Sequence, residues 1–326
     1  MHSVFPEMDG CNFAFASSPL PSTIPVPAAA AETKSAQLRI LMLHGFTQSG
    51  PSFRVKTRKL THLIKHSLSP AILGQYPGGI KFLYPTGPLN LIPADQTGDE
   101  ASHQEESDNW AWWRTLDTTS QYRELDSTFQ RLTDYISLHG PVDGVIGFSQ
   151  GAALAVMFAS WCESSIVPGR EFALATQEAP LTIAAPQGPL KFAVCFAGFK
   201  GTEQYYPGFY EPKIETPIMH IMGRLDNMVT EKHTMDLFDT CANGVLMAHD
   251  GGHYIPLQYN ILLPAVAFVE SMFREPYYIK DVDGFMRDRK ADAVLEIPKA
   301  KVERRNSLKS VVLCSRHIKV IRRRRY

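Results

Sequence analysis

The stretch Val145-Ile146-Gly147-Phe148-Ser149-Gln150-Gly151-Ala152-Ala153-Leu154 decides the fold of this chain. It is a G-x-S-x-G sequence that leaves an apolar run and enters a helical pattern. Such a serine sits on a sharp strand-to-helix turn, where side chains in place of the glycines would collide with the neighbouring strand and helix. The turn lifts the Ser149 hydroxyl above the sheet edge and places the Gln150 N–H where it can donate to a developing oxyanion. An ordinary strand–helix turn is the alternative.

Short apolar runs along the chain suit strands covered on both faces, as the strands of parallel sheets are. Helical patterns alternate with these runs, which predicts an α/β fold with a mostly parallel sheet of about six strands and helices on both faces. The runs are Leu38–Leu43, Ile80–Tyr84, Val142–Gly147, Phe192–Ala197, Ile218–Met222 and a weaker Val245–Ala248; the helical patterns are Arg54–His66, Tyr122–Leu138, Gln150–Trp161, Thr230–Thr240 and Pro256–Phe273.

The chain is long enough for one α/β domain of about 200–250 residues with tails and insertions. Residues 1–37, rich in Pro, Ala and Ser, are predicted to be disordered. The domain is expected over 38–275, followed by a C-terminal extension with a basic tail over 276–326. A polar stretch near 93–109 and an Ala/Pro/Gly-rich stretch near 163–189 read as surface insertions. Insertions of this kind often lie over the carboxyl ends of the strands and shape the substrate entrance.

The cysteines, the apolar runs and the first residues indicate where in the cell the protein is expected. The five cysteines are scattered without a C-x-x-C pair, so neither a disulfide framework nor a zinc site is indicated. No apolar run approaches the ~20 residues that a membrane span needs. The first ten residues contain no Lys or Arg and do not resemble a secretory signal. We therefore expect a cytoplasmic protein without a membrane span.

The net charge of zero is unevenly distributed. From Lys299 to Tyr326 there are eleven Lys and Arg residues against one acid, Glu303. A tail of this kind could bind nucleic acid, an anionic surface or an import receptor. A solvated disordered tail is the interpretation that we favour, because basic runs are weak compositional signals. Nucleic acid is therefore not expected as a partner.

A serine hydroxyl is a poor nucleophile at neutral pH and needs an adjacent base. His253 lies in the glycine-rich loop Asp250-Gly251-Gly252-His253-Tyr254-Ile255-Pro256, between the last strand-like run and the closing helix. That is where an α/β-hydrolase fold delivers its histidine. His44 follows the first strand and is expected to shape the loop there, and His220 lies inside a strand-like run.

The third member of such a site is a carboxylate that fixes the tautomer of the imidazole and stabilises the imidazolium. Asp226 follows the strand-like run that ends at Met222, and the order Ser149, Asp226, His253 matches the Ser…Asp…His order of this fold. Asp250 is the rival, for which we prefer a local role in a turn. Asp143 precedes the Ser149 strand and belongs to the wrong edge of the sheet.

Two further features complete the predicted site. The loop Leu43-His44-Gly45-Phe46-Thr47-Gln48-Ser49-Gly50 follows the first strand, and the Phe46 N–H is our candidate second oxyanion donor, opposite the Gln150 N–H. A plain strand–helix turn is the alternative. Trp110, Trp112 and Trp113, with Tyr254, are candidates for lining a substrate pocket. Core packing and scaffolding of the entrance remain equally open for the tryptophans.

Taken together, the stretches 43–49, 147–151, 223–226 and 251–256 resemble the fungal family of small serine hydrolases, whose members are similar to the human ovarian-cancer-associated serine hydrolase and the lovastatin-pathway thioesterase. The resemblance covers about Leu38 to Phe273. It implies the α/β-hydrolase fold and a triad of Ser149, Asp226 and His253. The 147–151 stretch is also shared with acyl-protein thioesterases and carboxylesterases. Some members of the family release polyketide chains from carrier domains.

We therefore expect a serine hydrolase that cleaves a carboxylic ester or thioester through an acyl-enzyme on Ser149, with no metal and no organic cofactor. The substrate would be a small-molecule or carrier-bound acyl compound. One alternative is a polyketide-releasing thioesterase of a fungal secondary-metabolite pathway, with a polyketide synthase as partner. Another is a catalytically silent binding protein, against which the complete triad argues. The acyl chain, the preference between esters and thioesters and the oligomeric state are not specified by the sequence.

Overall fold

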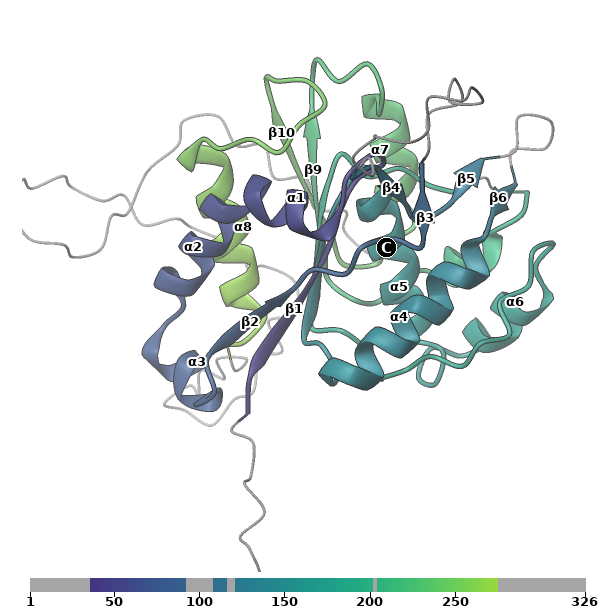
Figure 1. Cartoon of the computed structure of the whole chain (residues 1–326), viewed down its shortest axis with the longest axis horizontal. Helices are drawn as coiled ribbons and strands as arrows, with labels where there is room; N and C mark the ends of the chain where they lie inside the picture. Colours follow the sequence, from purple (N-terminus) through teal and green to yellow (C-terminus); the bar gives the residue numbers. More distant parts are fainter. Residues whose placement is uncertain (1–35, 92–107, 116–120, 202–203, 275–326) are drawn as a thin grey trace, which may run out of the picture. The chain divides into compact units, whose positions relative to one another are not determined.

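The structure, a computed structural model, describes residues 36–91, 108–115, 121–201 and 204–274 of the chain (Figure 1). The predicted amino-terminal segment, apart from its last two residues, and the predicted C-terminal extension lie outside the described residues. So does most of the expected insertion near 93–109. Within the described residues, no helix combines the length and the apolar character needed to cross a bilayer.

A six-stranded parallel sheet is the centre of the fold, in the order β10-β9-β8-β7-β1-β2. Each strand coincides, to within two residues at either end, with one of the apolar runs, so the predicted α/β-hydrolase sheet is confirmed. The strands are β1 Leu38–Leu43, β2 Ile80–Leu83, β7 Gly144–Phe148, β8 Phe192–Phe196, β9 Ile218–Gly223 and β10 Gly244–His249. Two small antiparallel pairs join β3 Leu89–Asn90 to β4 Trp110–Ala111 and β5 Arg114–Thr115 to β6 Tyr122–Arg123.

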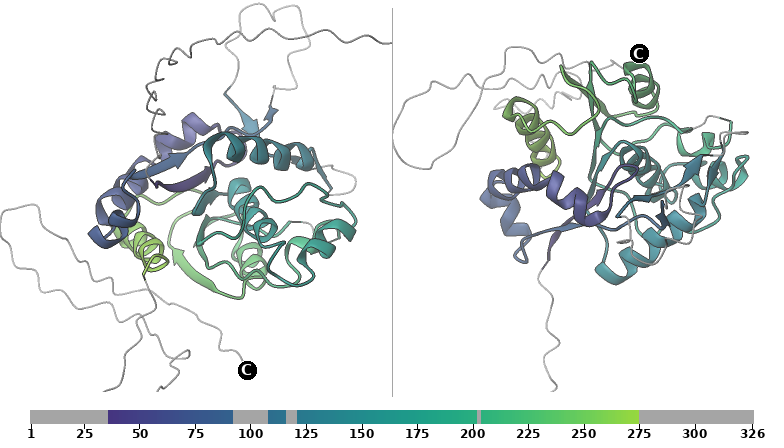
Figure 2. Two further views of the ribbon diagram at one scale, coloured as in Figure 1. Left: turned by 90° about the horizontal axis from the view of Figure 1, so that it is seen from below. Right: turned by 45° about the horizontal axis from the view of Figure 1, so that its top comes forward.

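Helices cover both faces of the sheet, because alternate apolar side chains of each strand point to opposite sides. From β1, Leu41 and Leu43 pack toward α4 and α5, whereas Ile40 and Met42 pack toward α1–α3 and α8. Figure 2 shows the same separation from two further directions. The helices are α1 Gly50–Lys56, α2 Arg58–Ser67, α3 Pro70–Gln75, α4 Leu125–His139, α5 Gln150–Cys162, α6 Arg170–Thr176, α7 Glu231–Phe238 and α8 Tyr259–Ser271, with a short 3-10 turn, η1, at Pro207–Phe209.

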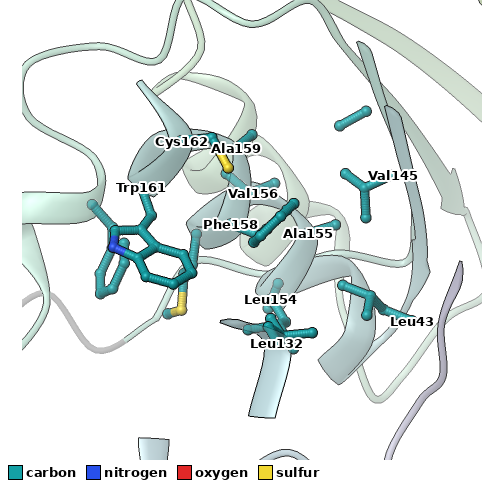
Figure 3. Close-up of a cluster of buried hydrophobic side chains, with 14 of the residues drawn as sticks. Leu43, Leu132, Val145, Leu154, Ala155, Val156, Phe158, Ala159, Trp161 and Cys162 are labelled. Carbon is teal, nitrogen blue, oxygen red and sulfur yellow. The ribbon is translucent and has the colours of Figure 1, made fainter. Parts of the chain in front are cut away.

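Helix α5 is buried along its whole length, which is why its sequence is apolar on every side. Figure 3 shows Leu154, Phe158 and Trp161 of this helix packed into one cluster with residues of the sheet and of α4. A rigid, buried helix therefore starts directly after Ser149 and holds the strand-to-helix corner in place.

Three predicted helices differ in their bounds. The pattern Pro256–Phe273 becomes helical only at Tyr259. The pattern Arg54–His66 forms two helices, α1 and α2, separated at Thr57, whose hydroxyl donates to the Phe53 carbonyl oxygen at 2.8 Å. The pattern starting at Tyr122 becomes helical only at Leu125. Tyr122 instead belongs to strand β6, where it is the antiparallel partner of Thr115 in β5.

The strand order reverses between β1 and β7. The chain passes from β1 outward to β2, and then returns to the other side of β1 and continues outward through β8, β9 and β10. The loops that leave β1 and β7 consequently diverge at the carboxyl edge of the sheet, and such a switch point is where open α/β sheets form their binding crevice. Phe46 follows β1 and Ser149 follows β7.

The stretch 163–189 contradicts the expectation that it covers the carboxyl ends of the strands. It contains α6, and it is anchored at the opposite edge of the sheet. Gln187 exchanges two hydrogen bonds with the backbone of Val142, just before β7, and Glu163 accepts from the Thr216 N–H, just before β9. Glu163 is itself buried and ion-paired with the buried Arg170. This stretch therefore belongs to the amino-end edge and not to the substrate entrance.

Candidate active site

Ser149 occupies a strained corner between β7 and α5, with φ 52° and ψ −118°. A non-glycine residue in this region costs of order 1–3 kcal/mol and persists only where the surroundings impose it. The close packing of the backbone around Ser149, which the flanking glycines permit, imposes it here. A Cβ atom on Gly147 would lie 2.2 Å from the Gly151 carbonyl oxygen, and one on Gly151 would lie 2.2 Å from the Leu43 carbonyl oxygen. Side chains at these two positions would therefore collide with neighbouring backbone, as the G-x-S-x-G sequence predicts.

A continuous chain of hydrogen bonds leads away from the Ser149 hydroxyl. Ser149 Oγ lies 3.0 Å from His253 Nε2, and His253 Nδ1 lies 2.7 Å from Asp226 Oδ2. The Phe148 ring packs against the imidazole with 4.9 Å between the ring centroids. The structure thus brings together three side chains that are 27 to 104 residues apart in the sequence. Their order and geometry suit proton transfer from the hydroxyl to the imidazole.

Asp226 is held from two sides. Its Oδ1 accepts hydrogen bonds from the Met228 and Val229 N–H groups, both at 2.9 Å, which leaves Oδ2 directed at His253. Its side chain is fully buried. The rival Asp250 is exposed and pairs with Arg224 at 3.2 Å.

Asp143, the other acid considered, lies at the amino end of β7. Its carboxylate accepts from the Arg39 N–H and from the Tyr76 hydroxyl, and pairs with Lys191. Asp143 therefore stabilises the amino ends of the strands, opposite the end where Ser149 lies, as its position before the strand predicts.

Phe46 and Gln150, whose N–H groups are the predicted oxyanion donors, lie beside Ser149. Both residues line the same pocket as Ser149. In the described part of the chain, neither N–H has a hydrogen-bond acceptor. Gln150 begins α5, so its N–H also lies at the positive end of that helix. Two unpaired donors beside a hydroxyl are the arrangement that stabilises a tetrahedral oxyanion.

His44 shapes the loop that carries Phe46, as expected. Its Nδ1–H donates to the Gly45 carbonyl oxygen at 2.8 Å, and its Nε2 accepts from the Gly87 N–H at 2.9 Å. Its ring stacks on Trp112 with 4.7 Å between centroids. Burial lowers the pKa of His44 to about 4, so the neutral ring that this pairing requires is the stable form.

The Gln150 side chain has a role that the sequence did not suggest. Its Oε1 accepts from the Trp112 N–H at 2.9 Å, and its Nε2 donates to the Trp113 carbonyl oxygen at 2.8 Å. The first residue of α5 thus binds the backbone of the tryptophan segment on both sides. This pairing positions one wall of the pocket relative to Ser149.

The pocket at Ser149 has a volume of about 460 Å³. Its lining residues are Phe46, Trp113, Arg114, Thr115, Ser149, Gln150 and Phe199. Of the four predicted pocket residues, the structure brings only Trp113 to it. Arg114, Thr115 and Phe199 were missed, because they lie on a two-residue strand and an irregular loop whose placement no local pattern indicates.

The other predicted pocket residues lie elsewhere. Trp112 is fully buried, and its Nε1–H donates to the His44 carbonyl oxygen. Trp110 pairs through its backbone with Asn90 and donates from its ring to Asp108 at 3.2 Å. Tyr254 is 46% exposed and packs on His249. The tryptophans 110 and 112 therefore serve as packing and scaffolding, the alternative that the sequence left open.

Known proteins resemble the chain over most of its length. It is 27% identical to the dihydrofolate reductase of Schizosaccharomyces pombe, with 84% of this chain and 55% of that protein covered. It is also 27% identical to the esterase OVCA2 of Danio rerio, with 67% and 90% covered. The chain spans about half the length of the first curated relatives that it matches. The crystal structure of Zea mays acyl-protein thioesterase 2 covers 74% of the chain, and 96% of that protein is covered, at 19% identity and a TM-score of 0.49.

The model of one protein family, described as "Serine hydrolase (FSH1)", matches residues 33–264. The matched region contains β1 and the loop with Phe46, the Ser149 corner, and the loops that carry Asp226 and His253. It accounts for more than two thirds of the 326 residues, and on that ground the chain belongs to the FSH1 family of serine hydrolases.

Proposed function

We propose that the chain hydrolyses carboxylic esters and thioesters through an acyl-enzyme on Ser149, with His253 as the general base and Asp226 as the carboxylate that orients it. The observation that carries this proposal is the continuous hydrogen-bond chain from Ser149 Oγ through both nitrogens of His253 to Asp226, at 3.0 and 2.7 Å. A hydroxyl needs such a partner to act as a nucleophile at neutral pH.

In the first half of the reaction, Ser149 Oγ attacks the substrate carbonyl carbon while its proton passes to His253 Nε2. The carbonyl oxygen becomes an oxyanion, which the Phe46 and Gln150 N–H groups stabilise. Asp226 stabilises the imidazolium and keeps the Nδ1 nitrogen protonated. The intermediate then collapses, the bond to the leaving alkoxide or thiolate breaks, and His253 supplies the proton to that group.

In the second half, water replaces the leaving group. His253 removes a proton from the water, and the resulting hydroxide attacks the acyl carbon of the Ser149 ester. The same two N–H groups receive the second oxyanion. Collapse of this intermediate returns the proton to Ser149 Oγ and releases the carboxylic acid, so the enzyme is regenerated without any other reactant.

Support for the reaction class also comes from the names of similar proteins. The family description names serine hydrolases, and a relative is named an esterase. Turnover of carrier-bound thioesters, a polyketide synthase as partner and a cytoplasmic location stay proposals that rest on the sequence.

Turnover of nitrophenyl esters tests the proposal. We expect steady hydrolysis by the wild-type protein and a fall in kcat of about 10⁴–10⁶ in Ser149→Ala. Ser137→Ala, an exposed hydroxyl on α4, is the matched control and should leave turnover unchanged. A binding protein without activity would show no turnover in any of the three, and that result would refute the proposal.

A further inference from the structure

A positive charge stands at the edge of the pocket that contains Ser149. Among the described residues that line this pocket, Arg114 is the one that carries a formal charge; its other walls include the aromatic rings of Phe46, Trp113 and Phe199. One guanidinium N–H group of Arg114 donates to the Asn90 carbonyl oxygen at 3.2 Å. That bond anchors the side chain at β3, and no other described residue accepts a hydrogen bond from its remaining N–H groups.

A second arginine lies directly opposite on the neighbouring strand. Arg114 of β5 and Arg123 of β6 are register partners in an antiparallel pair, so their side chains leave the same face of the two strands. Both residues are exposed. Like charges in directly opposite positions destabilise a strand pair. No acidic residue within 36–91, 108–115, 121–201 or 204–274 forms an ion pair with either arginine.

We propose that Arg114, with Arg123 beside it, binds an anionic group of the substrate, so that the enzyme prefers esters or thioesters that carry a second, negatively charged group. The inference rests on the proposed function of Ser149. A carboxylate or a phosphate fits, because a guanidinium presents paired N–H donors that match the oxygens of either group. The anion removes the repulsion between the two arginines, and the aromatic walls enclose the carbon chain that separates it from the scissile bond.

The anion has two possible positions in the substrate. It belongs either to the acyl part, as in the half-ester of a dicarboxylic acid, or to the leaving group, as in a thioester of a phosphorylated thiol. The chemistry that Arg114 recognises is the same in both cases. Because the arginines are exposed, water and salt reduce the interaction, and we expect a preference of about three- to tenfold in kcat/KM at low salt.

Two matched substrate pairs test the inference. On the acyl side, the nitrophenyl half-ester of glutaric acid is compared with the neutral nitrophenyl ester of monomethyl glutarate. On the leaving-group side, acetyl-coenzyme A is compared with acetyl-N-acetylcysteamine. We expect the charged member of one pair to be preferred, mainly through a lower KM. Added salt should reduce that preference.

The variants separate charge recognition from structural damage. In Arg114→Gln the ratio of kcat/KM between the charged and the neutral member of the pair should fall to about one, and Arg114→Lys should keep part of the preference. Arg123→Gln should weaken it, and Arg131→Gln, an exposed arginine on α4, should not change it. Equal kcat/KM for both members of both pairs in the wild-type protein would overturn the inference and leave the proposed hydrolase intact. If none of the four compounds is hydrolysed, the proposed function is refuted, and the inference with it.

Discussion

The two carboxylate oxygens of Asp226 have different partners. One carboxylate oxygen is occupied by the Met228 and Val229 N–H groups, and the other contacts His253 Nδ1. The carboxylate therefore cannot rotate without losing two backbone bonds. Asp250, only three residues from His253, instead forms an exposed ion pair with Arg224. Proximity in the sequence does not determine which acid meets the imidazole.

Substitution of this acid gives a sharp prediction. In Asp226→Asn, an amide that accepts from the same two backbone N–H groups presents its NH₂ to His253 Nδ1 and favours the wrong tautomer. We expect kcat for an ester substrate to fall by about 10⁴. Asp250→Asn serves as the matched control and should keep wild-type kcat. Comparable losses in both variants would contradict the assignment of Asp226.

At the scale of elements, two glutamine side chains perform the same task at opposite edges of the sheet. Gln150 makes one hydrogen bond to the Trp112 N–H and one to the Trp113 carbonyl oxygen, beside Ser149. Gln187 makes the same two kinds of bond with Val142, at the amino end of β7. Each amide joins two segments that lie 37 to 45 residues apart in the sequence.

Because the two glutamines make the same kinds of contact, their alanine variants can be compared directly. Gln150→Ala and Gln187→Ala each remove two hydrogen bonds to backbone groups, which should lower the free energy of unfolding by about 1–3 kcal/mol, more for the better buried Gln150. Only Gln150→Ala should also reduce kcat/KM, because it releases the pocket wall at Trp113. Denaturant unfolding and ester kinetics measure the two effects. An unchanged kcat/KM in Gln150→Ala, with stability reduced, would show that the wall does not depend on this amide.

The same elements explain what could be predicted from the sequence. The six strands and the Ser149 corner follow from local patterns, since a continuous apolar run and two glycines specify them without reference to distant residues. The neighbours Trp112 and Trp113 both belong to the core, and only Trp113 also lines the pocket. No local pattern indicates this difference, because Gln150 fixes their backbone from 38 and 37 residues away. Helix α6, whose N-cap Gly169 provides no side-chain hydrogen bond, and the register of Arg114 with Arg123 likewise have no local pattern that specifies them.

At the scale of the whole molecule, buried histidines link stability to pH. Burial lowers the pKa of His44 to about 4 and that of His220 to about 3. Above the ordinary histidine pKa of 6.5, both rings are neutral whether the chain is folded or not. As the pH falls below that value, the unfolded chain binds protons that the folded protein does not bind. The folded state therefore loses stability between 6.5 and about 4.

We expect the free energy of unfolding to decrease as the pH is lowered from 7 to 4.5, with about 1 kcal/mol per pH unit contributed by each of these histidines. His44→Gln removes one titrating group and should flatten the slope by that amount, whereas His62→Gln, on the exposed side of α2, should not. Denaturant unfolding at a series of pH values measures the slopes. Parallel curves for wild type and His44→Gln would contradict this explanation.

The most direct test of the central claim is to identify the residue that a fluorophosphonate modifies, by mass spectrometry of the digested protein. The account predicts a single phosphonyl group on the peptide that contains Ser149, formed much more slowly in His253→Ala. A phosphonyl group on a different residue, or equally fast modification of Ser149 without His253, would contradict it.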